Sequence, residues 1–163
     1  MEKVIKLGKQ SVKLSNNFSW VMEYRDQFGK DVIQEHLPVV ATMIEAVAGA
    51  VEDDTIASMT DLFKSLEGRT LDVLLPMMNT DFSSIIINTT WAMAKTADES
   101  ILPPKEWLKQ FEVFPLDVIV PTIYELALKG AMTSKNLKRL MTLTKTIQPL
   151  QSTPLSSQDL KED

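Results

Sequence analysis

Residues Phe82–Ala97, with the sequence FSSIIINTTWAMAKTA, decide the fold class. Their apolar side chains recur at helical intervals around most of the helix circumference, and Asp81 before them is a candidate N-terminal cap. A helix that is apolar nearly all round is normally buried among other helices. The stretch therefore predicts a mainly α-helical protein, a compact multi-helix bundle with this helix in its middle.

The segments before this stretch carry the punctuation of two further helices. The run Ser15–Asn17 and Asp31 supply candidate caps, and Gly29 is placed to end the first helix in the left-handed conformation. Pro38 either kinks the second helix or restarts it at its first turn. We expect a buried stripe at Val40, Met43, Ile44, Val47 and Val51. The earlier residues at helical spacing are Phe18, Val21, Met22, Arg25, Val32, Ile33 and Leu37.

The segments after it are divided in the same way. Pro103-Pro104 is the strongest internal break, and its second proline suits the first turn of a short helix. Phe114-Pro115 opens another helix that ends near Gly130, and Thr133 or Ser134 is placed to cap a basic helix after it. The helices expected from breaks and spacing cover residues 59–66, 71–78, 105–111, 116–130 and 136–147.

The first fourteen residues have a different pattern. Apolar residues alternate with polar ones on both sides of Gly8-Lys9, which is typical of a short β-hairpin. A lone hairpin is marginal in water, so it must lean on the helices or pair with another chain, and its lysines can protect its edges. We therefore expect one domain over residues 1–147, with a hairpin at 1–14 and helices at 15–147, followed by a disordered tail at 148–163 that is rich in Pro, Ser, Gln and Thr.

Composition excludes several classes of function. The chain has 163 residues, and its 17 basic and 22 acidic side chains give a net charge of −5, which disfavours nucleic acid as the main partner. It has no cysteine and a single histidine, His36, so a disulfide framework, a thiol nucleophile and a multi-histidine metal cluster are excluded. Lysines interrupt the opening apolar stretches, and no run is long enough to span a membrane. We expect a soluble cytoplasmic protein.

No catalytic motif is present, so we expect no enzyme, no cofactor and no metal. The chain lacks the glycine-rich phosphate loops, the nucleophile elbow, the paired-histidine zinc motif and the calcium loop. His36 has no evident nucleophile or oriented acid in the sequence, which favours a surface or half-buried histidine at a helix end. Glu52-Asp53-Asp54 reads as a solvated loop with a helix cap, because adjacent side chains diverge and rarely converge on a cation.

Two features indicate binding to proteins. The chain has nine methionines, whose adaptable thioethers suit surfaces that bind varied helices, although most methionines at helical spacing simply pack in a core. Lys135, Lys138 and Arg139 share one helix face by their spacing, and this face either docks an acidic surface of another copy or is only solvated.

Two long stretches resemble the tail-assembly chaperones of long-tailed (siphovirus) bacteriophages of Gram-positive hosts. The first is KVIKLGKQSVKLSNNFSWVMEYRDQFGKDVIQEHLPVVATMIEAVAG, where a strand pair precedes an aromatic-rich helix that ends in an F-G-x-D turn at Phe28–Asp31. The second is WAMAKTADESILPPKEWLKQFEVFPLDVIVPTIYELALKGAMTSKNLK, where a W-A-x-A-K helix at Trp91–Lys95 leads to a W-L-x-x-F helix at Trp107–Phe111. Together they cover somewhat over half of the chain, and residues 52–81 match poorly.

The resemblance implies a non-enzymatic role in the host cytoplasm. Such proteins are mostly helical and coat the tape-measure protein before the tail tube polymerises around it. Many have a second, longer form made by a ribosomal frameshift that recruits tube subunits, and some self-associate. The alternatives are a structural subunit of the virion, such as a head–tail connector or tail-completion protein, and a helical enzyme or small-molecule-binding protein. The side chains expected to line a groove for the client are Met77, Met78, Met93, Trp107, Phe111 and Phe114.

If the basic face docks a second copy, reversing its charge weakens self-association. We expect Lys138→Glu combined with Arg139→Glu to lower the average mass in light scattering, while circular dichroism shows an unchanged helical content. An unaltered oligomer would remove the assignment of Lys135, Lys138 and Arg139 to a contact between copies.

Overall fold

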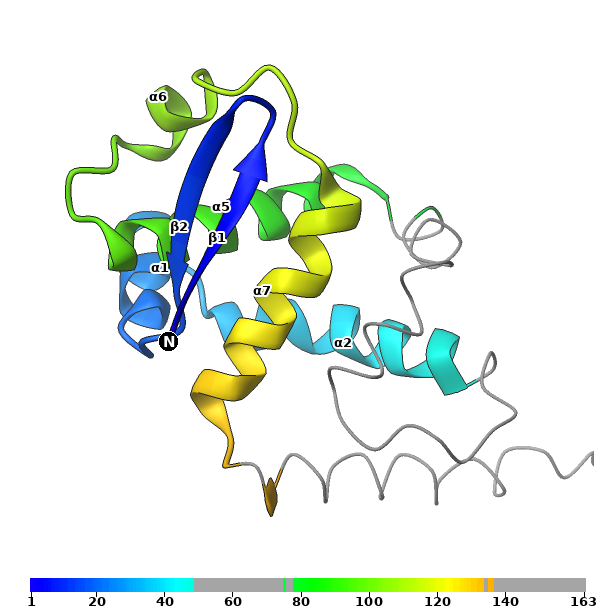
Figure 1. Ribbon diagram of the computed structural model, residues 1–163. Coiled ribbons are helices and arrows are strands. Elements are labelled where there is room, and N and C mark those ends of the chain that lie inside the picture. The colour runs from blue at the N-terminus through cyan, green and yellow to red at the C-terminus, as the bar shows by residue number, and fades with distance from the viewer. Residues whose placement is uncertain (49–74, 76–77, 134, 137–163) are drawn as a thin grey trace, which may run out of the picture.

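The computed structural model describes residues 1–48, 75, 78–133, 135 and 136, and its described part is mostly helical (Figure 1). This confirms the predicted mainly α class with an N-terminal hairpin, while the compact bundle stays a prediction. The helix expected at 59–66, most of those expected at 71–78 and 136–147, and the tail at 148–163 lie outside the described residues. The elements in chain order are β1 (Glu2–Leu7), β2 (Gln10–Ser15), α1 (Trp20–Phe28), α2 (Val32–Ala48), α5 (Thr80–Ala97), α6 (Pro104–Leu108) and α7 (Leu116–Ala131).

The hairpin forms where the sequence predicts it. β1 and β2 pair antiparallel, with Leu7 opposite Gln10 across a two-residue turn. Gly8 has a φ of 63° and no non-glycine residue of the described chain has a positive φ, which is the pattern of a type II′ turn with glycine first. Ile5 and Val12 oppose each other and are both buried, so one face of the hairpin belongs to the hydrophobic core.

Helix α5 is central among the described elements, as its all-round apolar character predicts. It packs against α1, α2, α7 and β2. Its cap is Asn79, whose side chain accepts a hydrogen bond from the Phe82 backbone N–H at 2.8 Å, so the prediction of Asp81 as the cap is wrong. Asp81 lies in the first turn, where a negative charge is favoured by the helix dipole.

Most other helix ends lie where the sequence places them, but the N-cap of α1 is Ser19, without a side-chain cap hydrogen bond, so the prediction of a cap within Ser15–Asn17 is wrong. Gly29 ends α1 with a φ of 67°, and the Asp31 carboxylate accepts hydrogen bonds from the first backbone N–H groups of α2. Pro104 occupies the first turn of α6, and the Thr133 hydroxyl accepts from the Asn136 backbone N–H. Helix α2 runs without interruption through Pro38, so the proline does not restart it.

The buried faces of α1 and α2 are not those that the simplest spacing picks out. Trp20 and Tyr24 of α1 are buried, whereas Phe18 and Met22 face outward. In α2, Val32 and Val39 are buried and Ile33 and Leu37 are exposed. Helix α2 therefore has apolar residues on two faces, of which the one with Val32 and Val39 is buried, whereas Met22 is the one exposed large apolar residue of α1. The expected stripe from Val40 onward lies mostly beyond the described side chains.

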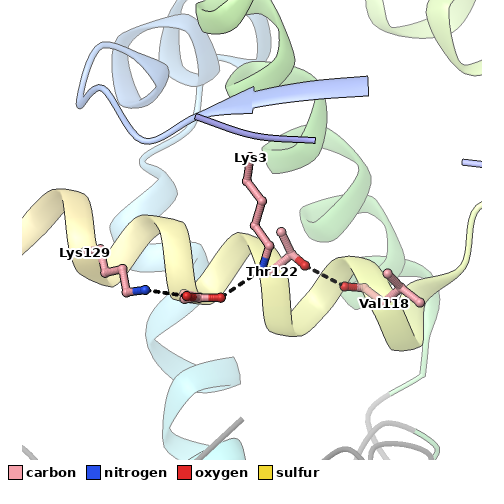
Figure 2. Close-up of polar contacts among 5 residues, drawn as sticks. Lys3, Val118, Thr122 and Lys129 are labelled. Carbon is pink, nitrogen blue, oxygen red and sulfur yellow. Dashed lines mark hydrogen bonds and ion pairs between the residues drawn. The ribbon is translucent and has the colours of Figure 1, made fainter. Parts of the chain in front are cut away.

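The hairpin is held on α7 by one shared carboxylate. Glu125 forms an ion pair with Lys3 of β1 at 3.0 Å and another with Lys129 at 2.5 Å (Figure 2). Burial alone would raise the pKa of Glu125, but the hydrogen bonds from Lys129 and Lys3 outweigh it and lower the pKa below its ordinary value. One turn further along α7, a Cβ added at Gly130 would lie 2.5 Å from the Asn16 carbonyl oxygen. Hairpin and helix thus approach each other closely.

The close approach makes Gly130→Ala destabilising. Alanine normally stabilises a helix interior by about 1 kcal/mol over glycine, whereas forcing a methyl group into a packed backbone contact costs about 1–3 kcal/mol. We expect urea denaturation to show a net loss of stability. Gly29→Ala is the comparison: nothing lies within 4 Å of its added Cβ, so it measures the cost of a left-handed backbone alone. A Gly130→Ala protein as stable as the parent would contradict the described contact.

Candidate functional site

A cluster of polar side chains joins four helices in the interior. Its centre is His36 of α2, whose Nδ1 lies 2.6 Å from the Tyr124 hydroxyl of α7 and whose Nε2 lies 2.7 Å from the Thr89 hydroxyl of α5. A neutral imidazole has one N–H donor and one acceptor nitrogen, and each hydroxyl can play either part. Both ring nitrogens of this partly buried histidine are therefore satisfied, whichever tautomer is present.

The residue before it ties α2 to α1. Glu35 accepts a hydrogen bond of 2.5 Å from the Tyr24 hydroxyl through Oε2 and one of 2.6 Å from the Lys30 ammonium through Oε1. Tyr24 is fully buried and packs its ring against Phe28, with centroids 5.0 Å apart. Neighbouring residues of α2 thus reach different helices, and together they fix the first two turns of α2 in place.

The electrostatics of the cluster favour neutral rings and a charged carboxylate. Burial lowers the pKa of His36 to about 4, although the nearby Glu35 charge opposes the shift. Burial also raises the pKa of Tyr24 and of Tyr124 far above the ordinary value for tyrosine. Burial would raise the pKa of Glu35 as well, but the hydrogen bonds from Lys30 and Tyr24 lower it overall. At neutral pH the cluster has one ion pair and uncharged partners.

The pairing of a hydroxyl with His36 is the arrangement that activates a nucleophile in many enzymes. The sequence gives no sign of such a partner, so Thr89 is a finding of the structure. Thr89 is only 1% exposed and Tyr124 only 4%, so a substrate has no direct path to either hydroxyl. No group of His, Asp and Glu side chains within the described residues is arranged to hold a metal ion. The geometry is thus that of a buried hydrogen-bond network that connects helices.

One pocket of about 250 Å³ lies between α1 and the chain that follows α5. Glu23 and Asp26 line it from α1, and Trp91 and Ile101 line it from the other side. Its volume is below the roughly 300–1,000 Å³ typical of small-molecule sites. The pocket contains no member of the polar cluster.

Helix α2 has a face of exposed apolar side chains. We call it the α2 outer face, and it consists of Ile33, Leu37 and Ala41, which follow one another at intervals of four residues. Ile33 is 49% exposed and Leu37 is 61% exposed. Exposed apolar residues at this spacing form a continuous stripe on a helix, and such stripes mark contacts between proteins.

The side chains expected in a client groove are only partly brought together. Trp107, Phe111 and Phe114 form one aromatic cluster, with the Trp107 ring centroid 4.9 Å from that of Phe111 and 6.3 Å from that of Phe114. Trp107 is buried, whereas Phe111 and Phe114 are half-buried at the surface. Met93 is fully buried in α5 and packs in the core, which is the alternative that the sequence left open.

Of the remaining predicted site residues, some are exposed and the others lie outside the described residues. Met78 is exposed and lies apart from the aromatic cluster in the sequence, and Met77 lies outside the described residues. Lys135 is exposed, while Lys138 and Arg139 also lie outside the described residues. The docking of a second copy on these basic side chains therefore stays a prediction.

Sequence reasoning missed the partners of His36 and Glu35 because Thr89, Tyr124 and Tyr24 lie on three different helices, α5, α7 and α1, with no fixed spacing. One signal was available. The chain has only two tyrosines, Tyr24 and Tyr124, and both occupy positions that helical spacing allows in a core. A tyrosine buried in a core normally gives its hydroxyl a hydrogen-bond partner.

The low pKa of His36 predicts a stability that depends on pH. Between pH 6.5 and about 4 the unfolded chain binds a proton that the folded chain does not, so folding weakens as the pH falls through this range. The full shift corresponds to about 3 kcal/mol. Urea denaturation from pH 7 to 4.5 is expected to show this slope. His36→Gln should flatten it above pH 5, whereas Glu125→Gln should leave it in place; a slope unchanged by His36→Gln would contradict the described burial.

Comparison with known proteins assigns no residue of this cluster or of the exposed faces. No protein family, no curated protein and no solved structure matches the chain.

Proposed function

We propose that this chain is a non-enzymatic tail-assembly chaperone of a long-tailed bacteriophage, which binds the tape-measure protein and keeps it soluble before the tail tube polymerises. The proposal starts from the resemblance of the two sequence stretches. The observation in the structure that supports it best is the α2 outer face, an apolar stripe on a helix with no covering element among the described residues.

An exposed stripe of this kind suits a helical client. A tape-measure protein is long and helical with apolar patches, and an amphipathic helix binds through side chains spaced like Ile33, Leu37 and Ala41. Each contact is small, because the apolar area that one such face can bury is limited. Many copies along one client add up to firm coverage, since linked sites raise the effective concentration. Weak single contacts also allow the polymerising tube to displace the chaperone.

The polar cluster supports this role by holding the stripe in place. Glu35 and His36 lie between Ile33 and Leu37 in the sequence, and they fasten α2 to α1, α5 and α7. A surface that is rigid before binding loses less conformational entropy when a client arrives. The buried side of α2 thus keeps the outer face in the orientation in which it meets the client.

Co-expression tests the proposal directly. We expect a phage tape-measure protein that is insoluble alone to become soluble when the chain is present. Ile33→Gln with Leu37→Gln should return most of the client to the pellet, because it removes the apolar stripe while leaving the charge unchanged. Met22→Gln with Val118→Gln is the matched control, since it replaces two exposed apolar residues on other helices.

Two results would contradict the proposal. One is a client that stays insoluble in the presence of the chain. The other is the recovery of the chain from purified phage particles by mass spectrometry, which would favour a structural subunit of the virion, because a chaperone leaves before the particle is complete.

A further inference from the structure

The free edge of β1 has a pattern that can pair with itself. The turn-flanking residues Leu7 and Gln10 exchange hydrogen bonds in a two-residue hairpin, and such pairs then alternate along the strands. The Asn16 N–H also donates to the Met1 carbonyl at 3.1 Å, which extends the same alternation. The odd-numbered residues of β1 therefore bond to β2. The backbone N–H and C=O groups of Glu2, Val4 and Lys6 point away from it.

These outward groups have no backbone partner within residues 1–48 and 78–133. The sheet of the described chain has two strands, so β1 is an edge strand, and α5 packs against its partner β2. An outer strand with unpaired backbone groups is a template for another strand. The side chains on this edge are also exposed, with Val4 60% exposed although it is a large apolar residue.

The order of charges along β1 matches a second copy of the same strand. When two antiparallel β1 strands are centred on Val4, the two valines face each other and Glu2 of each copy faces Lys6 of the other. Directly opposed pairs in a sheet interact most strongly, and opposite charges there are stabilising. Lys6 has no ion pair in the described chain, and Glu2 has only an exposed one with Lys13 at 3.3 Å.

We propose that two copies of this chain associate through their β1 edges, in a two-fold antiparallel pairing centred on Val4 that makes one four-stranded sheet. A two-fold axis requires a surface that complements itself, and the sequence Glu2–Lys6 meets this requirement. Lys6 would repel most other strands from this edge, but in this register it faces Glu2 of the second copy. The pairing describes how the self-association expected of the proposed chaperone takes place, and to that extent it rests on the proposed function.

Disulfide trapping tests the pairing because the chain has no cysteine of its own. At Val4 the two Cα atoms would be about 5.5 Å apart, which is within the range that a disulfide spans. We expect Val4→Cys to form a linked dimer under glutathione disulfide about tenfold faster than Lys9→Cys, whose residue is also exposed but lies in the turn. Equal rates for the two variants would overturn the proposal.

Charge variants in the Val4→Cys protein test the register. Lys6→Glu places two carboxylates opposite each other and should slow the linking, and adding Glu2→Lys should restore it by exchanging the charges. Lys9→Glu is the control for net charge and should have no effect. Linking that ignores Lys6→Glu, or that Glu2→Lys fails to restore, would overturn the pairing. No client is present, so these results are independent of whether the chain solubilises a tape-measure protein.

Discussion

The hydrogen bonds of one imidazole fix the relative positions of α2, α5 and α7. His36 reaches Thr89 and Tyr124 at the same time, so none of the three helices can slide without leaving a buried polar atom unpaired. An unpaired buried donor or acceptor costs about 1–3 kcal/mol, whereas apolar contacts tolerate small shifts. The imidazole therefore specifies an arrangement that hydrophobic packing alone would leave loose. Both faces of α2 depend on it, since the same few residues determine which side turns inward.

Local chemistry made part of this structure predictable. The turn at Gly8-Lys9, the left-handed end of α1 at Gly29 and the first turn of α6 at Pro104 each follow from the conformational limits of glycine or proline. The central place of α5 follows from apolar residues on all its sides. These features depend on neighbours in sequence, and sequence reasoning works best at that range.

The rest depended on contacts between distant segments. Spacing alone does not choose between two pairs around α1, because Phe18 and Met22 are four residues apart, as are Trp20 and Tyr24. Phe18 lies in the turn before α1, and both it and Met22 are exposed. The larger aromatic pair is the one that packs inward, beside Phe28 and its neighbour Trp91. The site is less predictable still, because the partners of His36 are 53 and 88 residues away. Trp107, Phe111 and Phe114 lie within eight residues of one another, so the sequence could group them. For Met93 the sequence allowed two places, the core or a surface that meets a client.

The ion pair between Lys3 and Glu125 has a consequence for synthesis. Its two residues are separated by 122 positions, so the ribosome has made most of the protein before the first strand can reach the helix on which it rests. Nascent chains grow at about 5–20 residues per second, which leaves the amino-terminal ribbon without its support for many seconds. Because a lone hairpin is marginal in water, the first fifteen residues gain the support of α7 only late in synthesis.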